Sequence, residues 1–203
     1  YLKKKFNIKI DGITCDFFME APFFLKKNFQ TLDQLYLLIE NSRELKIKYI
    51  VLPLVDNGRI KNKTYEKIFL KQVLKLSKIL EKNKVKLIFE SDFEPQKLLK
   101  FINKLPKKNF GINYDSGNSA GFNYKFEDEK IYFHRVLNIH LKDKNKKNIS
   151  VDLGKGVANF KDLFEYCKKI NYKGNYILQT ARNKNDIAIM KKNIKFLKKK
   201  FLW

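Results

Sequence analysis

The chain has 203 residues, of which 44% are hydrophobic, and it carries a net charge of +23 and two cysteines without C-x-x-C spacing. This composition is that of a globular protein with one substantial core, and the cysteines exclude a secreted fold framed by disulfides. The length suits one domain over residues 1–203. Because no apolar run approaches bilayer-spanning length and no segment resembles a signal peptide, we expect no membrane partner and a cytoplasmic location.

The positive charge does not indicate a nucleic-acid partner. Clustered Lys and Arg side chains attract phosphate backbones. Here, however, arginine occurs at only four positions, and lysine supplies 40 of the 44 positive side chains, scattered over every predicted helix. We therefore interpret the charge as a solvated surface and predict no specific nucleic-acid partner. Self-association into a homo-oligomer is allowed but not required by the sequence.

Six apolar runs along the chain predict six strands, each followed by a helix. The predicted strands cover residues 6–13, 49–52, 85–90, 110–113, 136–141 and 176–179. The predicted helices cover residues 31–45, 64–83, 94–106, 127–134 and 159–170, with a last helix from residue 186. The segment 116–121, which contains two glycines, is expected to be a loop after the fourth strand.

Helix starts are indicated by polar capping residues. Thr31 with Gln34 forms a capping-box pattern, and Asn159 and Asp186 stand where N-cap residues are expected. The last helix carries an apolar stripe at Met190, Ile194, Leu197 and Phe201, which predicts one buried face.

Repeated alternation of strand and helix predicts an α/β fold with a parallel sheet and helices outside it. An open doubly wound sheet has the same alternation, but the glycine fingerprint that it carries after the first strand is absent. We predict a parallel (β/α) TIM-type barrel that is incomplete at its N-terminus, with about six of eight βα units. Six units leave two unpaired strand edges, which predicts instability or self-association.

Four consecutive predicted strands end in a side chain that can bind a metal ion, namely Glu90, Asp115, His140 and Gln179. Because the carboxyl ends of parallel barrel strands lie on one face, these side chains are expected to converge there. Two carboxylates, an imidazole and an amide oxygen suit one divalent ion, Mn²⁺ or Mg²⁺ in the first place. For each residue a structural alternative stays open: a salt bridge for Glu90, an Asx turn for Asp115, simple packing for His140 and a hydrogen bond within the barrel mouth for Gln179.

Six motifs in order along the chain resemble the sugar phosphate isomerase/epimerase family, which has a xylose isomerase-like TIM barrel. They are MEAP at 19–22, IVLPLVD at 50–56, NYDSGNSA at 113–120, HLKD at 140–143, LGKG at 153–156 and ILQTAR at 177–182. The resemblance implies that the chain begins near the third barrel strand. It also implies a divalent-metal-dependent isomerase or epimerase that acts on a sugar or sugar phosphate through an enediolate.

The resemblance places Glu90, Asp115 and His140 as metal ligands, with Gln179 in the fourth position, where the family has a glutamate. Co²⁺ or Zn²⁺ is allowed besides Mn²⁺ and Mg²⁺. Glu90 is then the leading catalytic base, and Asp143 is the nearest second acid or base. An amide cannot accept a proton as a base, so Gln179 argues against a mechanism with two carboxylate bases.

For substrate binding, Asn118 and Lys142 are candidates for hydroxyl contacts, and Arg182 is the candidate for a phosphate or carboxylate because its planar fork matches paired oxygens. Two alternatives remain. One is a sugar-binding relative that has lost its chemistry at Gln179. The other, which is disfavoured because the chain has only two histidines, is an apurinic-site endonuclease with a zinc cluster.

Overall fold

The structure is a computed structural model that describes residues 2–179 and 185–201. In this part of the chain, six strands form one sheet in the order β1-β2-β3-β4-β5-β8. The residues group into two compact units, Tyr1–Ser91 with Lys100–Ile112 and Asp92–Leu99 with Asn113–Trp203. The single domain over residues 1–203 stays a prediction.

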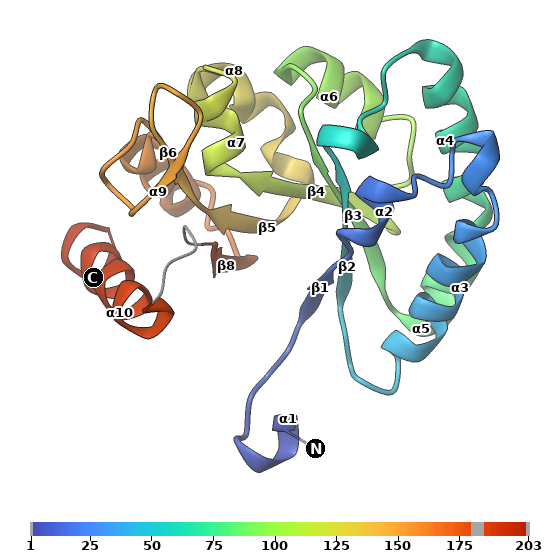
Figure 1. Ribbon diagram of the computed structural model, residues 1–203, viewed down its shortest axis with the longest axis horizontal. Coiled ribbons are helices and arrows are strands. Elements are labelled where there is room, and N and C mark those ends of the chain that lie inside the picture. The colour runs from blue at the N-terminus through green and yellow to red at the C-terminus, as the bar shows by residue number, and fades with distance from the viewer. Residues whose placement is uncertain (1, 180–184, 202–203) are drawn as a thin grey trace. The chain divides into compact units, whose positions relative to one another are not determined.

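The first unit contains three strands and the beginning of a fourth. The strands are β1 (Gly12–Thr14), β2 (Tyr49–Leu54), β3 (Lys86–Ser91) and the first half of β4 (Phe110–Asp115). The helices are α1 (Leu2–Lys5), α2 (Phe17–Glu20), η1 (Lys26–Asn28), α3 (Thr31–Ser42), η2 (Asp56–Gly58), α4 (Lys63–Lys75), α5 (Ser77–Asn83) and the end of α6 (Pro95–Ile102). Helices α3, α4 and α5 lie along β2 and β3 (Figure 1). The aromatic rings of Phe23, Phe69, Phe89 and Phe101 pack in this core, with Phe23 stacked on Phe69 and edge contacts from Phe69 to Phe89 and from Phe89 to Phe101.

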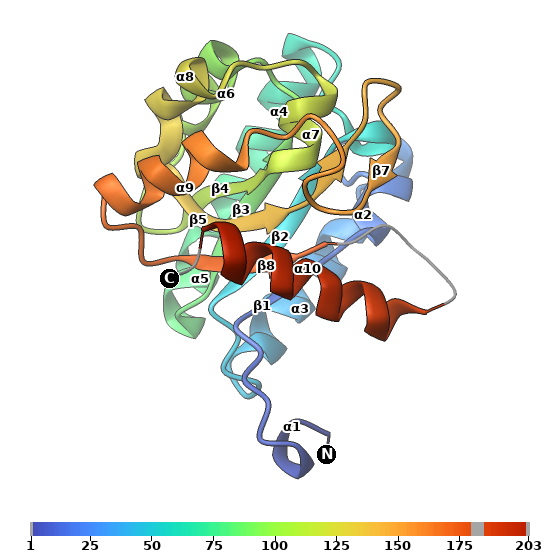
Figure 2. The ribbon, with the colours of Figure 1, turned by 90° about the vertical axis from the view of Figure 1, so that its left-hand side faces the viewer.

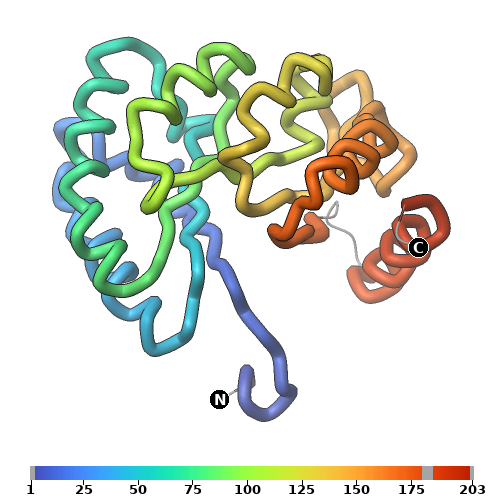
Figure 3. Tube along the Cα trace, turned by 180° about the vertical axis from the view of Figure 1, so that it is seen from behind, coloured from blue at the N-terminus to red at the C-terminus, as the bar shows by residue number. Residues whose placement is uncertain are grey.

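The second unit contains the end of β4 and two further strands of the sheet, β5 (Val136–Leu141) and β8 (Asn175–Leu178). A separate antiparallel hairpin pairs β6 (Asp143–Lys144) with β7 (Ser150–Val151). The helices are α7 (Ser116–Gly121), α8 (Phe126–Glu129), η3 (Lys130–Arg135), α9 (Phe160–Lys169) and α10 (Asp186–Lys200). Helices α9 and α10 lie side by side (Figures 2 and 3), and the rings of Phe160 and Phe196 are in contact between them.

The strands from the second onward are confirmed within a few residues, and four other elements differ from prediction. The short helix predicted over residues 127–134 is the α-helix α8 followed by the 3-10 helix η3. The first strand was predicted over residues 6–13, but only Gly12–Thr14 pairs with β2, and the apolar side chains before it are exposed. Residues 116–121 form helix α7 and not a loop. The long helix predicted over residues 64–83 is two helices, divided at Leu76.

The predicted helix caps are partly confirmed. Asn159 caps α9 through its side chain. The last helix is capped by Asn185, so the prediction of Asp186 as its N-cap is wrong. The Thr31 capping box does not form, because Gln30 occupies the N-cap position and makes no side-chain cap. No helix in the described ranges combines the length and apolarity that crossing a bilayer requires.

Candidate metal centre

Three predicted ligands end three neighbouring strands. Glu90 lies near the end of β3, Asp115 is the last residue of β4, and His140 is the penultimate residue of β5. Glu90, Asp115 and His140 are only 7%, 5% and 4% exposed, respectively. A buried carboxylate is costly unless a cation or hydrogen-bond donors stabilise its charge. Burial of two acids at adjacent strand ends therefore favours a cation-binding role.

The pairing register explains why the two acids project from the same face of the sheet. Ile88 of β3 is the pairing partner of Gly111 of β4. Side chains alternate between the two faces along a strand, while paired residues of neighbouring strands project to one side. Glu90 is two residues beyond Ile88, and Asp115 is four residues beyond Gly111. Both steps are even, so the two carboxylates share a face.

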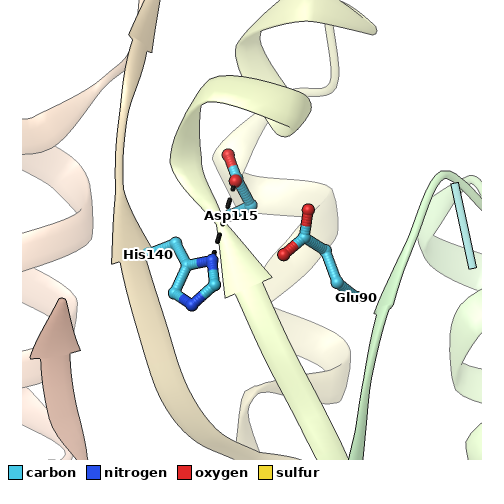
Figure 4. A group of neighbouring side chains, drawn as sticks. All are labelled: Glu90, Asp115 and His140. Carbon is cyan, nitrogen blue, oxygen red and sulfur yellow. Dashed lines mark ion pairs between the residues drawn. The ribbon is translucent and has the colours of Figure 1, made fainter. Parts of the chain in front are cut away.

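The three side chains turn toward one another (Figure 4). Glu90, Asp115 and His140 each offer one ligand atom, and these atoms all lie within 4.8 Å of one another. Nδ1 of His140 is 4.0 Å from Oδ2 of Asp115. Among the described residues, this is the group of histidine and acidic side chains whose geometry suits a metal ion. Two carboxylates and an imidazole are suitable donors for Mn²⁺, Mg²⁺, Co²⁺ or Zn²⁺.

Asp115 has a structural task as well as a place in this group. Its Oδ1 accepts the backbone N–H of Asn118 at 2.8 Å and so caps helix α7. This bond is the Asx-type interaction that was the alternative to metal binding. The two interpretations are compatible, because the bond uses Oδ1 while Oδ2 is the oxygen nearest His140. The cap thereby sets the orientation of the carboxylate.

Ser116 links this turn to Lys142, the residue that directly follows strand β5. Its Oγ donates to the carbonyl oxygen of Lys142 at 2.7 Å and accepts the backbone N–H of Lys142 at 3.0 Å. Gly117 allows the close approach, because a Cβ atom there would lie 2.6 Å from Cγ of Lys142. This role of Ser116 was not predicted from the sequence. Its position directly after a candidate ligand was the available signal.

A family sequence model described as xylose isomerase-like TIM barrel matches residues 2–200. The chain belongs to this family. The six parallel strands with intervening helices agree with the family fold, so the predicted α/β class and barrel type are confirmed. No curated protein sequence matches the chain.

Solved structures with the xylose isomerase-like fold resemble the chain at low sequence identity. The 3-keto-D-glucoside 4-epimerase of E. coli superposes with a TM-score of 0.77 at 13% identity, covering 97% of this chain and 81% of its own. A sugar phosphate isomerase/epimerase from Parabacteroides distasonis gives 0.74 at 17% identity, covering 98% and 74%. The D-allulose 3-epimerase of Methylomonas sp., solved in complex with D-allulose, gives 0.75 at 11% identity, covering 98% and 80%. At these identities the likeness shows the fold.

Gln179 is the predicted fourth ligand. Its backbone N–H donates to the carbonyl oxygen of Leu141 at 3.1 Å, which continues the pairing of β8 with β5. His140 is the pairing partner of Ile177, so Gln179, two residues further, projects from the same face as His140. Its Oε1 is buried and has no hydrogen-bond partner among the described residues. A buried amide oxygen in this state fits a ligand, and the role stays a prediction.

Asp143 has three backbone donors. Its carboxylate accepts the N–H groups of Gly154 and Gly156 at 2.9 Å each and that of Ala158 at 3.0 Å. These bonds hold the segment 153–158 against the β6–β7 hairpin. They account for the burial of Asp143 without a chemical step, and its catalytic role stays a prediction.

The structure describes two of the three predicted substrate-binding residues, Asn118 and Lys142. Oδ1 of Asn118 accepts a hydrogen bond from Nζ of Lys144 at 3.1 Å, so Lys144, which was not predicted from the sequence, lies beside this residue. The half-buried side chain of Lys142 crosses Gly117. Arg182 lies outside the described residues. All three contacts to substrate stay predictions.

Proposed function

We propose that this protein is a divalent-metal-dependent isomerase or epimerase that acts on a sugar or sugar phosphate. The observation that carries the proposal is the group formed by Glu90, Asp115 and His140, whose ligand atoms lie within 4.8 Å of one another at adjacent strand ends. Membership of the xylose isomerase-like family supports it, and so do structural neighbours that are sugar epimerases and isomerases.

The ligands of the ion would be Glu90, Asp115, His140 and Gln179. With both carboxylates ionised, and with a neutral imidazole and a neutral amide, the ligands carry two negative charges that balance a divalent cation. A bound ion supplies Lewis-acid stabilisation of negative charge on the carbonyl oxygen of the substrate. The oxygen-rich donor set suits Mn²⁺ or Mg²⁺ best.

Glu90 is the leading candidate for the base that removes the proton from the carbon beside the carbonyl. The product is an enediolate. Return of the proton to the former carbonyl carbon, together with movement of the hydroxyl proton to the former carbonyl oxygen, completes a 1,2-isomerisation. Gln179 cannot carry the proton on the opposite face, which favours a reaction with a single base over two-base epimerisation. Asp143 is the proposed second acid or base where one is needed, and three backbone donors hold its carboxylate in place.

The sugar would contact polar side chains around the strand ends. Asn118 and Lys142 are proposed to bind substrate hydroxyls, and Lys144 orients Asn118 through its hydrogen bond. Arg182 is proposed to bind a phosphate or carboxylate group. A preference for phosphorylated sugars that disappears in Arg182→Ala would support this last assignment.

Titration of the protein with Mn²⁺, followed by calorimetry and electron paramagnetic resonance, tests the proposal. His140→Ala should weaken binding by at least about 10-fold, because loss of a ligand costs no less than loss of an outer-shell partner. His134→Ala is the matched control, because His134 is the other histidine and is exposed. Equal Mn²⁺ affinity of both variants and the wild type would refute the metal site.

A sugar-binding protein without turnover is the second candidate, and Gln179 is the observation that favours it. Gln179→Glu would supply the missing carboxylate. If wild-type protein isomerises ketose or aldose sugars with Mn²⁺, the enzyme proposal stands. If neither form turns over sugar while both bind sugar and Mn²⁺, the protein is a binder.

A further inference from the structure

Another buried acid contacts both sides of the β4–α7 turn and takes no part in the proposed ligand set. Glu129, at the end of the short helix α8, is only 2% exposed. Its Oε2 accepts hydrogen bonds from the hydroxyls of Tyr114 at 2.9 Å and Ser119 at 2.6 Å, and its Oε1 accepts one from Tyr132 at 2.9 Å. All of these residues belong to the second unit.

Two of the three hydroxyl groups belong to residues that flank Asp115 in the sequence. Tyr114 precedes Asp115 in β4, and Ser119 lies four residues after it in α7. Glu129 therefore binds one residue from each arm of the turn that carries the candidate ligand. Ser116 ties the same turn to β5 through Lys142. The turn is thus held by hydrogen bonds on two sides.

The chemistry of the contact explains why the residue is a glutamate. An ionised carboxylate only accepts hydrogen bonds, and its two oxygens can serve three converging hydroxyl donors. Hydrogen bonds to a charged acceptor are about twice as strong as neutral ones, and they offset part of the cost of burial, which raises the pKa of Glu129. An apolar side chain would fill the same volume but would leave buried hydroxyls without this acceptor.

We propose that Glu129 is a positioning residue that fixes the Asp115 carboxylate for metal binding, an inference that rests on the proposed function. It does so by holding Tyr114 and Ser119 at a fixed separation across the turn. Loss of the carboxylate frees the two arms to shift, and the oxygen of Asp115 nearest His140 then no longer meets the ion in the geometry of the wild type.

Glu129→Gln tests the proposal, with Mn²⁺ affinity as the main measurement. Glu127→Gln is the matched control for charge, because Glu127 lies on the same helix, is exposed and pairs with Lys130. Leu163→Ala is the control for general destabilisation, because Leu163 is buried in α9 and is not a partner of Glu129. Affinity is measured well below each unfolding midpoint, so that every protein is folded.

The expected result is a Mn²⁺ dissociation constant about 10-fold higher in Glu129→Gln, in the range found for partners that orient metal ligands. Glu127→Gln should match the wild type, and Leu163→Ala should unfold at a lower temperature with unchanged Mn²⁺ affinity. Unchanged affinity in Glu129→Gln, or an equal loss in Leu163→Ala, would assign Glu129 to stability alone and overturn the proposal.

Tyr114→Phe keeps the proposal testable if Glu129→Gln does not fold. It removes one hydroxyl from the turn and should raise the dissociation constant by a smaller factor, with little further loss when Ser119→Ala is added. Wild-type affinity in Tyr114→Phe would contradict the positioning role. Failure of the wild-type protein to bind Mn²⁺ would instead refute the proposed function, and the positioning role with it.

Discussion

The side-chain amide of Asn138 donates a hydrogen bond to Oδ1 of Asn113 at 2.6 Å, and each residue stands two positions before a candidate ligand. Asn113 precedes Asp115 in β4, and Asn138 precedes His140 in β5. Because side chains alternate along a strand, the two amides share the face of the two ligands. The pair therefore joins the neighbouring strands one layer away from the candidate metal centre.

Asn138→Leu should destabilise the protein by about 1–3 kcal/mol, because it removes the donor from a buried acceptor. The measurement is the free energy of unfolding in urea. In the double variant Asn113→Leu/Asn138→Leu, both polar groups are gone, so the loss should be smaller than the sum of the two single losses. Strictly additive losses would show that the two amides do not act as a pair.

Ser116→Ala should weaken Mn²⁺ binding as well as stability, because Ser116 connects the turn of Asp115 to β5. The part-buried N–H of Lys142 would lose its acceptor, at a cost of about 1 kcal/mol. Ser150→Ala, in the β6–β7 hairpin, is the control with the same chemical change. Equal Mn²⁺ affinity and equal unfolding free energy in the two variants would argue against the connection.

The thiol of Cys15 should react slowly with alkylating reagents. Burial, with a smaller contribution from the neighbouring Asp16, raises its pKa to about 11. Since the thiolate is the reactive form, the alkylation rate should climb as pH rises toward that value. Asp16→Asn should increase the rate at about pH 8. Mass spectrometry of the alkylated protein, in a Cys167→Ser background, measures both rates.

The same raised pKa predicts a direction for stability. The folded state favours the protonated thiol, so the contribution of Cys15 is fully present below the ordinary pKa of 9.0 and is lost as pH rises toward about 11. Cys15→Ser should reduce this alkaline loss. An unfolding free energy with the same alkaline slope in both proteins would place the cause elsewhere.

Self-association through the edge strand β8 should increase with salt. This strand stands at one end of the sheet order, and Ile177 within it is 44% exposed. The net charge of +23 opposes association at low ionic strength, and salt screens that repulsion. Ile177→Lys should keep the protein monomeric in sedimentation experiments, because a charge on an edge strand blocks pairing.

Ile187→Lys is the comparison for this experiment, because Ile187 on α10 is also exposed. If Ile187→Lys prevents association and Ile177→Lys does not, the contact involves the helix and the edge-strand prediction fails.

The sequence determined the strands that end in the candidate site. A continuous apolar run followed by one polar side chain can be recognised from the local amino-acid sequence alone, as at Glu90, Asp115 and His140. The chain could also be placed in its family from short motifs that keep their order.

Tertiary structure alone decided the elements that depend on distant partners. Residues 6–13 alternate like a strand, but only three residues of β1 pair with β2. Residues 116–121 have weak helix propensity and form α7 on the Asp115 cap. The local amino-acid sequence does not distinguish buried Glu129 from exposed Glu127, because the hydroxyl groups that Glu129 binds come from β4, α7 and η3. A hydrogen-bond network of this kind exists only after the chain has brought its donors together.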